Sequence, residues 1–93
     1  KAELGDKKAA LTDFETAIRL DPQFAKAYSN RGIVKSELGD NKGAMSDFDT
    51  AIGINPHYTT SYYNRGRLKY IVEDYKGAIA DYDRAIAIDP HHA

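Results

Sequence analysis

The sequence predicts an all-α protein, a stack of antiparallel helix pairs, and three observations lead to this prediction. Residues 62–66 (Tyr-Tyr-Asn-Arg-Gly) repeat residues 28–32 (Tyr-Ser-Asn-Arg-Gly) at an offset of 34 residues. The same offset relates Pro22, Pro56 and Pro90. Between these marks, apolar residues recur at the three- and four-residue spacing of an amphipathic helix. A fixed period of this length is typical of arrays in which each repeat is one unit stacked on the next.

The chain is expected to begin with the end of a helix over residues 1–5. A Gly-Asp pair at residues 5–6 matches a Gly-Asp pair at 39–40. Glycine commonly ends a helix and aspartate commonly caps the next one, so a turn is expected at both places. The third copy has Glu-Asp at 73–74, and that turn must form without the residue that most easily takes a positive φ.

Three helices are expected to carry an aromatic residue between alanines on one apolar stripe. They are predicted over residues 7–20, 41–54 and 75–88. The aromatic residues are Phe14, Phe48 and Tyr82. The small alanines allow a neighbouring helix to approach closely, and the aromatic ring fills the space between the two helices.

Each of these helices ends at an Asp-Pro or Asn-Pro pair, because proline disfavours the helical conformation of the preceding residue. A second kind of helix then follows, predicted over residues 24–37 and 58–72. Gly32 and Gly66 lie in the middle of these helices. Because a mid-helix glycine costs about 1 kcal/mol relative to alanine, two glycines at the same phase predict a close helix–helix crossing.

Arg31 and Arg65 lie on the apolar stripe of the glycine-bearing helices. A partly buried arginine needs a carboxylate partner. The candidates are Asp13, Asp47 and Asp81, each of which precedes the aromatic residue of its helix. We therefore expect Arg–Asp pairs between helices, and a ligand-binding role for the arginines is the alternative.

Composition argues against several functional classes. With 13 basic and 14 acidic residues the net charge is −1, so no overall field favours nucleic acid or an anionic membrane. The absence of cysteine excludes disulfides, thiol catalysis and cysteine-based zinc sites. No apolar run approaches the ~20 residues that a membrane-spanning helix needs. We expect a soluble protein, cytoplasmic by default.

No pattern in the sequence favours catalysis or a cofactor. The acidic residues are dispersed at the phase of the repeat and do not form a catalytic carboxylate pair. No phosphate-binding loop or nucleophile elbow is present. His91 and His92 are adjacent, would point apart on a helix, and have no evident third ligand. We predict that the protein is not an enzyme and has no catalytic residues, metal site or cofactor.

The repeat resembles the tetratricopeptide repeat. The matching positions are Tyr28, Gly32, Ala44, Phe48, Ala51 and Pro56 in one copy, Tyr62, Gly66, Ala78, Tyr82, Ala85 and Pro90 in the next, and Ala10, Phe14, Ala17 and Pro22 in a partial first copy. The resemblance implies one right-handed superhelical array over residues 1–93. Its parts would be a partial repeat (1–21), two repeats (22–55 and 56–89) and the start of a further repeat or a tail (90–93).

The sequence departs from the family pattern at two positions in each full copy. Arginine stands where leucine is usual, at Arg31 and Arg65. Lysine stands where tyrosine is usual, at Lys35 and Lys69.

In the family the first helix of each pair lines a concave groove. The resemblance therefore implies a groove face on the helices over 24–37 and 58–72. Its candidate binding residues are Lys26, Ser29, Asn30, Ile33, Thr60, Tyr63, Asn64, Arg67 and Tyr70, with Ser36, Glu37 and Ile71 on the same face.

The resemblance also implies how a peptide would be held. Asn30 and Asn64 recur where asparagines of related arrays contact the backbone of an extended peptide, and an asparagine amide both donates and accepts. Tyr63, Arg67 and Tyr70 form an aromatic, cationic patch of the kind that often anchors partners. Packing at the end of the array is the alternative for Tyr70 and Ile71.

The carboxylate clamp of the chaperone-binding subfamily is not expected. Asn30 fits one of its asparagines, but Thr60 and Asn64 stand where lysine and arginine are needed.

We therefore predict a non-catalytic scaffold that binds a peptide segment or partner helix in its groove. Both ends of the array are expected to expose apolar surface, since no polar capping helix is visible. The alternative function is therefore a structural module that self-associates by stacking end to end.

Overall fold

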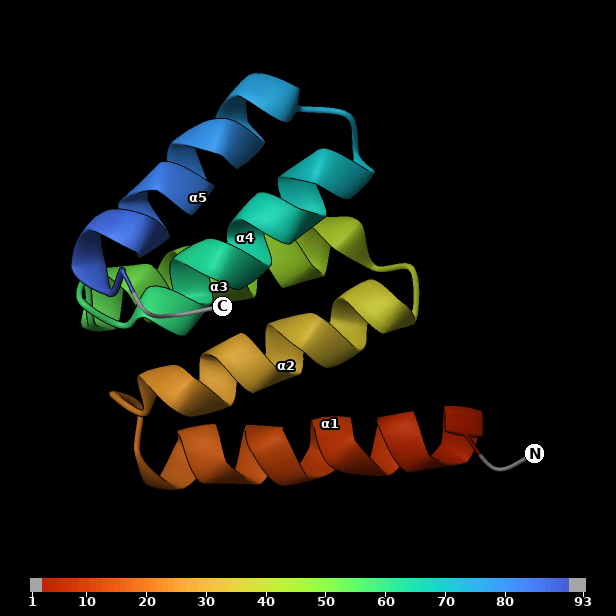
Figure 1. Ribbon diagram of the computed structural model, residues 1–93. Coiled ribbons are helices and arrows are strands. Elements are labelled where there is room, and N and C mark those ends of the chain that lie inside the picture. Colours follow the sequence, from red (N-terminus) through yellow and green to blue (C-terminus); the bar gives the residue numbers. More distant parts are fainter. Residues whose placement is uncertain (1–2, 91–93) are drawn as a thin grey trace.

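The computed structural model describes residues 3–90, and this part of the chain contains five α-helices and no β-strand (Figure 1). The helices are α1 (Glu3–Leu20), α2 (Ala25–Glu37), α3 (Asn41–Ile54), α4 (Thr59–Ile71) and α5 (Tyr75–Ile88). The prediction of an all-α fold is confirmed. The bounds of α2 to α5 also agree with the predicted ranges to within one residue at each end.

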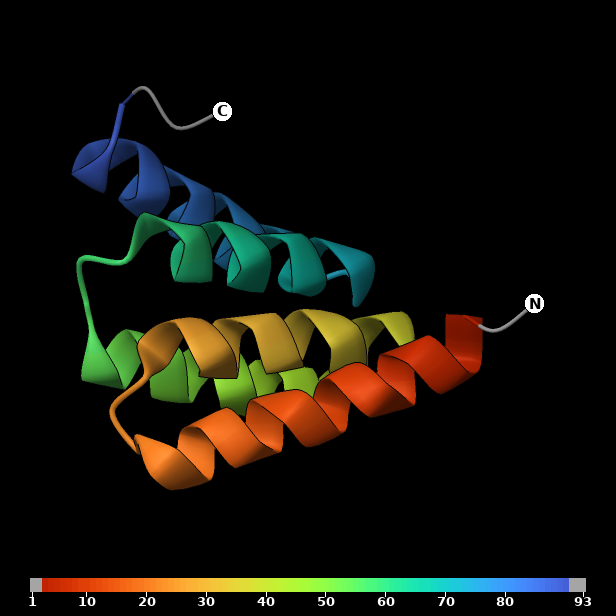
Figure 2. The ribbon, with the colours of Figure 1, turned by 90° about the horizontal axis from the view of Figure 1, so that it is seen from below.

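The helices form a curved stack in which α2 and α4 lie inside and α1, α3 and α5 lie outside. Helices α2 and α3 form one antiparallel pair, α4 and α5 form the next, and α1 packs on α2 (Figures 1 and 2). Inner helices α2 and α4 contact each other, whereas within residues 3–90 the outer helices make no contacts among themselves. The stack therefore curves towards α2 and α4, which contact each other, and away from the separated outer helices. The concave surface is the one formed by α2 and α4.

The predicted turn at residues 5–6 is wrong, because α1 is one continuous helix. The equivalent turns between α2 and α3 and between α4 and α5 each join two helices that pack on each other. Each of these turns contains one residue with a left-handed backbone conformation, Gly39 at φ 89° and Glu73 at φ 70°. In the described chain no helix precedes α1 and packs back on it. Continuing the helix through Gly5 costs only about 1 kcal/mol and retains the backbone hydrogen bonds. Glu73 takes the left-handed conformation without the help of glycine.

The core lies between the two layers and is centred on Phe48, which is 2% exposed. Its ring packs with Ala44 and with Leu68 of α4. The ring also lies against Gly32, where a Cβ atom would come within 2.7 Å of it. At the equivalent position of the next repeat, a Cβ on Gly66 would lie 3.1 Å from the Tyr82 ring. The prediction that these glycines mark close helix crossings is confirmed.

Replacing Gly32 with alanine is expected to lower the free energy of unfolding by about 1–3 kcal/mol, because overpacking outweighs the gain in helix propensity. The matched control is Gly53→Ala, also in a helix, where nothing lies within 4 Å of the added Cβ. That change should be neutral or stabilise by up to ~1 kcal/mol. Urea denaturation of both variants tests the assignment, and equal effects at the two sites would contradict it.

The expected Arg–Asp pairs join each inner helix to its outer partner. Arg31 donates to both carboxylate oxygens of Asp47 at 2.8 Å, and Arg65 does the same to Asp81, also at 2.8 Å. This bidentate geometry is the strongest form of such a pair. Asp13 is exposed and pairs with neither arginine. The arginines therefore hold the helix pairs together, and the expectation of Arg–Asp pairs between helices is met at Arg31 and Arg65.

Candidate functional site

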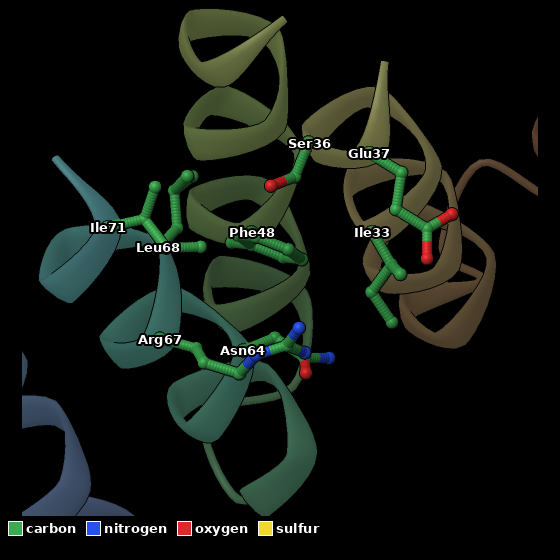
Figure 3. Close-up of a pocket in the computed structure, with 8 residues that line it drawn as sticks. All are labelled: Ile33, Ser36, Glu37, Phe48, Asn64, Arg67, Leu68 and Ile71. Atoms are coloured by element: carbon green, nitrogen blue, oxygen red, sulfur yellow. The ribbon is translucent and has the colours of Figure 1, made fainter. Parts of the chain in front are cut away.

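The concave surface is formed by α2 and α4, which carry all nine residues predicted to bind a ligand. The structure brings three of them, Ile33, Asn64 and Arg67, to one small pocket between the two helices (Figure 3). The remaining pocket residues are Ser36 and Glu37 of α2, Phe48 of α3, and Leu68 and Ile71 of α4. The pocket therefore lies between the two inner helices, and the core residues Phe48 and Leu68 form its bottom.

Asn64 is the residue of this pocket whose hydrogen bonding is incomplete. Its side chain lies on the side of α4 that faces α2, and the residue is only 8% exposed. Its amide nitrogen Nδ2 is buried and has no hydrogen-bond partner among the residues that the structure describes. A buried donor without a partner costs about 1–3 kcal/mol. The nitrogen is covered in this conformation, so a ligand acceptor such as a peptide carbonyl would reach it only once the Asn64 side chain turns towards the surface.

Two charged side chains line the pocket from opposite helices. Arg67 lies one turn after Asn64 on the same face of α4, and Glu37 lies on α2 (Figure 3). Arg67 is exposed, as is Glu37, and no ion pair joins them within the described chain. The rim of the pocket thus presents a donor and an acceptor above a floor made by Phe48 and Leu68.

The size of the pocket limits what it can hold. Its volume is about 30 Å³, whereas sites for drug-sized ligands and cofactors measure about 300–1,000 Å³. A space of this size takes one or two water molecules or one small chemical group. It is suited to a single carbonyl or methyl group of a longer ligand that runs along the surface.

Ser29 does not present its side chain to an open groove. The residue is fully buried, and its hydroxyl lies 3.0 Å from the hydroxyl of Ser61, with which it shares a hydrogen bond. These two small residues allow α2 and α4 to approach each other. The structure therefore places Ser29 in the contact between the inner helices.

The aromatic residues lie on the side of α4 that faces α5 and at its C-terminal end. Tyr63 packs its ring on Tyr82 with 5.6 Å between centroids, and Tyr70 meets Tyr75 edge to face at 5.3 Å. Burial, with Tyr63 nearby, raises the pKa of Tyr82 above its usual value of 10. Tyr70 remains exposed. Both tyrosines therefore contact α5, and the binding role of the patch formed by Tyr63, Arg67 and Tyr70 stays a prediction.

The other predicted residues lie elsewhere on the inner helices. Lys26 is exposed at the start of α2, beside a shallow depression formed by the turns before α2 and α4. Asn30 and Thr60 are half-buried. Asn30, the counterpart of Asn64 in the repeat, is not among the residues that line the pocket between α2 and α4. The two asparagines are therefore one repeat apart along the surface and do not share a pocket.

The floor of the pocket and the incomplete hydrogen bonding of Asn64 were not predicted from the sequence. Phe48 was recognised only as a core residue, and no signal in the sequence distinguishes the environment of Asn64 from that of Asn30. Within residues 3–90, no three His, Asp or Glu side chains are grouped as metal ligands would be. In the same part of the chain, no helix is both long and apolar enough to cross a membrane.

Comparison with known proteins supports the repeat assignment along nearly the entire chain. A family model described as "TPR repeat" matches residues 1–39. Two models described as "Tetratricopeptide repeat" match residues 25–58 and 60–92. No curated protein matches the chain.

Solved structures with a similar fold include a TPR of Spaghetti and MamA. The first TPR of Spaghetti (RPAP3), bound to the HSP90 peptide SRMEEVD, has a TM-score of 0.89 and 24% identity, with 97% of this chain and 71% of that chain covered. MamA has a TM-score of 0.86 and 23% identity, and the similarity covers 95% of this chain and 52% of MamA. The chain thus spans about half the length of MamA. At these identities the likeness establishes the fold.

Proposed function

Because the chain belongs to the tetratricopeptide repeat family, we propose that its concave surface binds an extended peptide segment of a partner protein. The observation that carries this proposal is the buried, unpartnered Nδ2 of Asn64 in the pocket between α2 and α4. A TPR of the same fold is solved with a bound peptide, which supports the class of ligand. The chain would act as a non-catalytic scaffold.

In this proposal the Asn64 side chain turns towards the concave surface and donates a hydrogen bond from Nδ2 to a backbone carbonyl of the peptide. Backbone recognition of this kind does not depend on the peptide's side chains. Arg67 and Glu37 at the rim would select charged neighbours on the peptide, and Asn30 would contact the same peptide one repeat away. Tyr63 and Tyr70, which lie on the side of α4 towards α5, would provide further apolar contacts. Thr60 and Asn64 occupy positions where a carboxylate clamp needs cations, so the peptide need not end at this site.

The test begins with the selection of short linear peptides from a displayed random library against the intact chain. The affinity of a selected peptide is then measured by titration calorimetry for the chain and for the variant Asn30→Ala/Asn64→Ala. We expect the double variant to lose about 1 kcal/mol of binding free energy or more for each lost hydrogen bond. Unchanged affinity would contradict the role of the asparagines.

A sharper variant is Asn64→Asp, which keeps the shape of the side chain and removes the donor. Asn41→Asp, on the outer helix α3, makes the same change of charge away from the concave surface. We expect only the change at residue 64 to weaken the peptide. If both variants bind equally well, or both bind equally poorly, Nδ2 is not the group that recognises the ligand.

A second candidate function, end-to-end self-association, is favoured by the apolar side chains that α5 exposes. Sedimentation of the chain alone over a range of concentrations distinguishes the two functions. Self-association through the ends would be unaffected by the changes at Asn30 and Asn64, whereas peptide binding would be weakened.

A further inference from the structure

Most charged side chains of the inner helices already pair with the outer helices. Those that form ion pairs with α3 or α5 are Arg31, Lys35, Arg65 and Lys69. Lys26, Glu37 and Arg67 are exposed and form no ion pair within residues 3–90. In the described chain, α2 and α4 therefore offer a charge to a ligand at these three positions.

Two of these three charges lie at the pocket between α2 and α4, and they have opposite signs. Glu37 lines the pocket from α2 and Arg67 lines it from α4. In Figure 3 the side chain of Arg67 extends from α4 towards α2. Lys26 lies at the start of α2 and does not line this pocket. A ligand that crosses from one inner helix to the other here meets a negative charge over α2 and a positive charge over α4.

The space between the two charges admits only a small side chain. Its volume is about 30 Å³, which is room for a methyl or hydroxymethyl group. Phe48 and Leu68 at its bottom are 2% and 1% exposed, and close packing around them prevents them from moving aside. Ile71 lines the pocket as well, but it is 54% exposed and is not held by the core.

We propose that the groove selects an extended peptide in which a basic residue and an acidic residue lie on opposite sides of a glycine, alanine or serine. The basic residue meets Glu37 over α2, and the acidic residue meets Arg67 over α4. The small residue lies at the pocket between them. This inference rests on the proposed function and names the class of peptide that the same site takes.

The two charges act by exclusion as well as by attraction. A uniformly acidic segment places a like charge against Glu37, and a uniformly basic segment places one against Arg67. Like charges that are brought together in an interface suppress the wrong partners. Exposed ion pairs contribute little affinity of their own. The charges therefore decide which peptide binds more than how tightly it binds.

The first test compares the peptides that one displayed random library yields against the intact chain and against two charge-reversed variants. Wild type should enrich peptides with a basic and an acidic residue on opposite sides of a small one. Arg67→Glu should replace the acidic residue of this pattern with a basic one, and Glu37→Lys should replace the basic residue with an acidic one. Lys42→Glu, exposed on the outer helix α3, is the matched control and should enrich the wild-type pattern.

The second test measures, by titration calorimetry, one peptide of the wild-type pool and the same peptide with its two charges exchanged. Wild type should bind the exchanged peptide at least about threefold more weakly. The chain with Glu37→Lys and Arg67→Glu together should show the reverse preference. Both residues are exposed, so the unfolding midpoints of these variants should equal that of wild type.

The third test concerns the size of the pocket. Replacing the small residue of the selected peptide with leucine should weaken its binding to wild type about tenfold, because the larger side chain overfills the space. Ile71→Ala widens the pocket and should recover most of this loss. Ile79→Ala, on α5 and 60% exposed, is the matched control and should recover none of it.

The inference is overturned if the charge-reversed chains enrich the same pattern as wild type, or if wild type enriches uniformly charged peptides. It is also overturned if Ile71→Ala and Ile79→Ala have equal effects. Peptides that fail these tests but lose affinity for the Asn30→Ala/Asn64→Ala variant leave the proposed function standing. Peptides that pass them and are indifferent to both asparagines support the inference and contradict the role of the asparagines alone. A library that yields no binding peptide overturns both proposals.

Discussion

Replacing Phe48 with alanine is expected to lower the free energy of unfolding by about 3–5 kcal/mol. The ring is 2% exposed and packs with Ala44, Leu68, Ile33 and Met45, so it joins helices of both repeats. Its removal leaves a cavity between rigid helices that cannot close. A chain of this length is typically stable by about 5–14 kcal/mol, so this single change removes a large share of the total.

The matched control is Phe14→Ala, at the equivalent position of α1. Phe14 is half-buried, and the same truncation there should cost about 1–2 kcal/mol, in the range of an average substitution. Urea denaturation of both variants measures the difference. A loss below ~1 kcal/mol at Phe48, or equal losses at the two positions, would mean that the core is not centred where the structure places it.

A double-mutant cycle links this prediction to the helix crossing. The cost of Gly32→Ala comes from the Phe48 ring, because the added Cβ would come within 2.7 Å of a ring carbon. In the Phe48→Ala background the added methyl group meets no ring and helps to fill the cavity. The cost of Gly32→Ala should therefore vanish or change sign there, since residues in contact do not contribute additively.

The helix positions could be predicted from the sequence because the signals for them are local and recur. Proline, glycine and aspartate mark the helix ends at a fixed phase, and the stripes show which faces are buried. The turn at residues 5–6 could not be excluded in this way, because the local signal there is the same as at 39–40. A Gly-Asp pair permits a turn, and only the packing of one helix on the next makes the turn favourable.

The candidate site was less predictable because it depends on how the inner helices meet. Ser29 contacts Ser61, a separation of 32 residues, so this contact joins positions that are not equivalent in the repeat. Alignment of the copies therefore cannot reveal it. The burial of Asn64 against α2 has the same origin, since Asn30 has the same identity in its copy and a different neighbour. Periodicity predicts which residues are equivalent, and it does not predict the offset at which equivalent helices pack.

Replacing Asp81 with asparagine is expected to lower the free energy of unfolding by about 3 kcal/mol at neutral pH, because it leaves two cations facing a neutral group. Arg65 donates to both oxygens of Asp81 at 2.8 Å, and Lys69 lies 3.1 Å from one of them. Asp49→Asn is the matched control, because Asp49 pairs with the same arginine at 2.9 Å. The side chain of Asp49 is 57% exposed and that of Asp81 only 6% exposed, so the control should cost less than ~1 kcal/mol.

The pH dependence provides an independent test of the same pair. Burial alone raises the pKa of the Asp81 carboxyl, but the hydrogen bonds from Arg65 and Lys69 outweigh it and hold the pKa below the usual 3.8. A carboxyl with a lowered pKa in the folded state contributes its full stability above the unfolded pKa and loses it as the pH falls through the folded pKa. The difference in unfolding free energy between wild type and Asp81→Asn should therefore be constant from pH 7 to about pH 5 and shrink below about pH 4. A difference that stayed constant down to the lowest pH at which the protein remains folded would show that Asp81 is not held ionised by this pair.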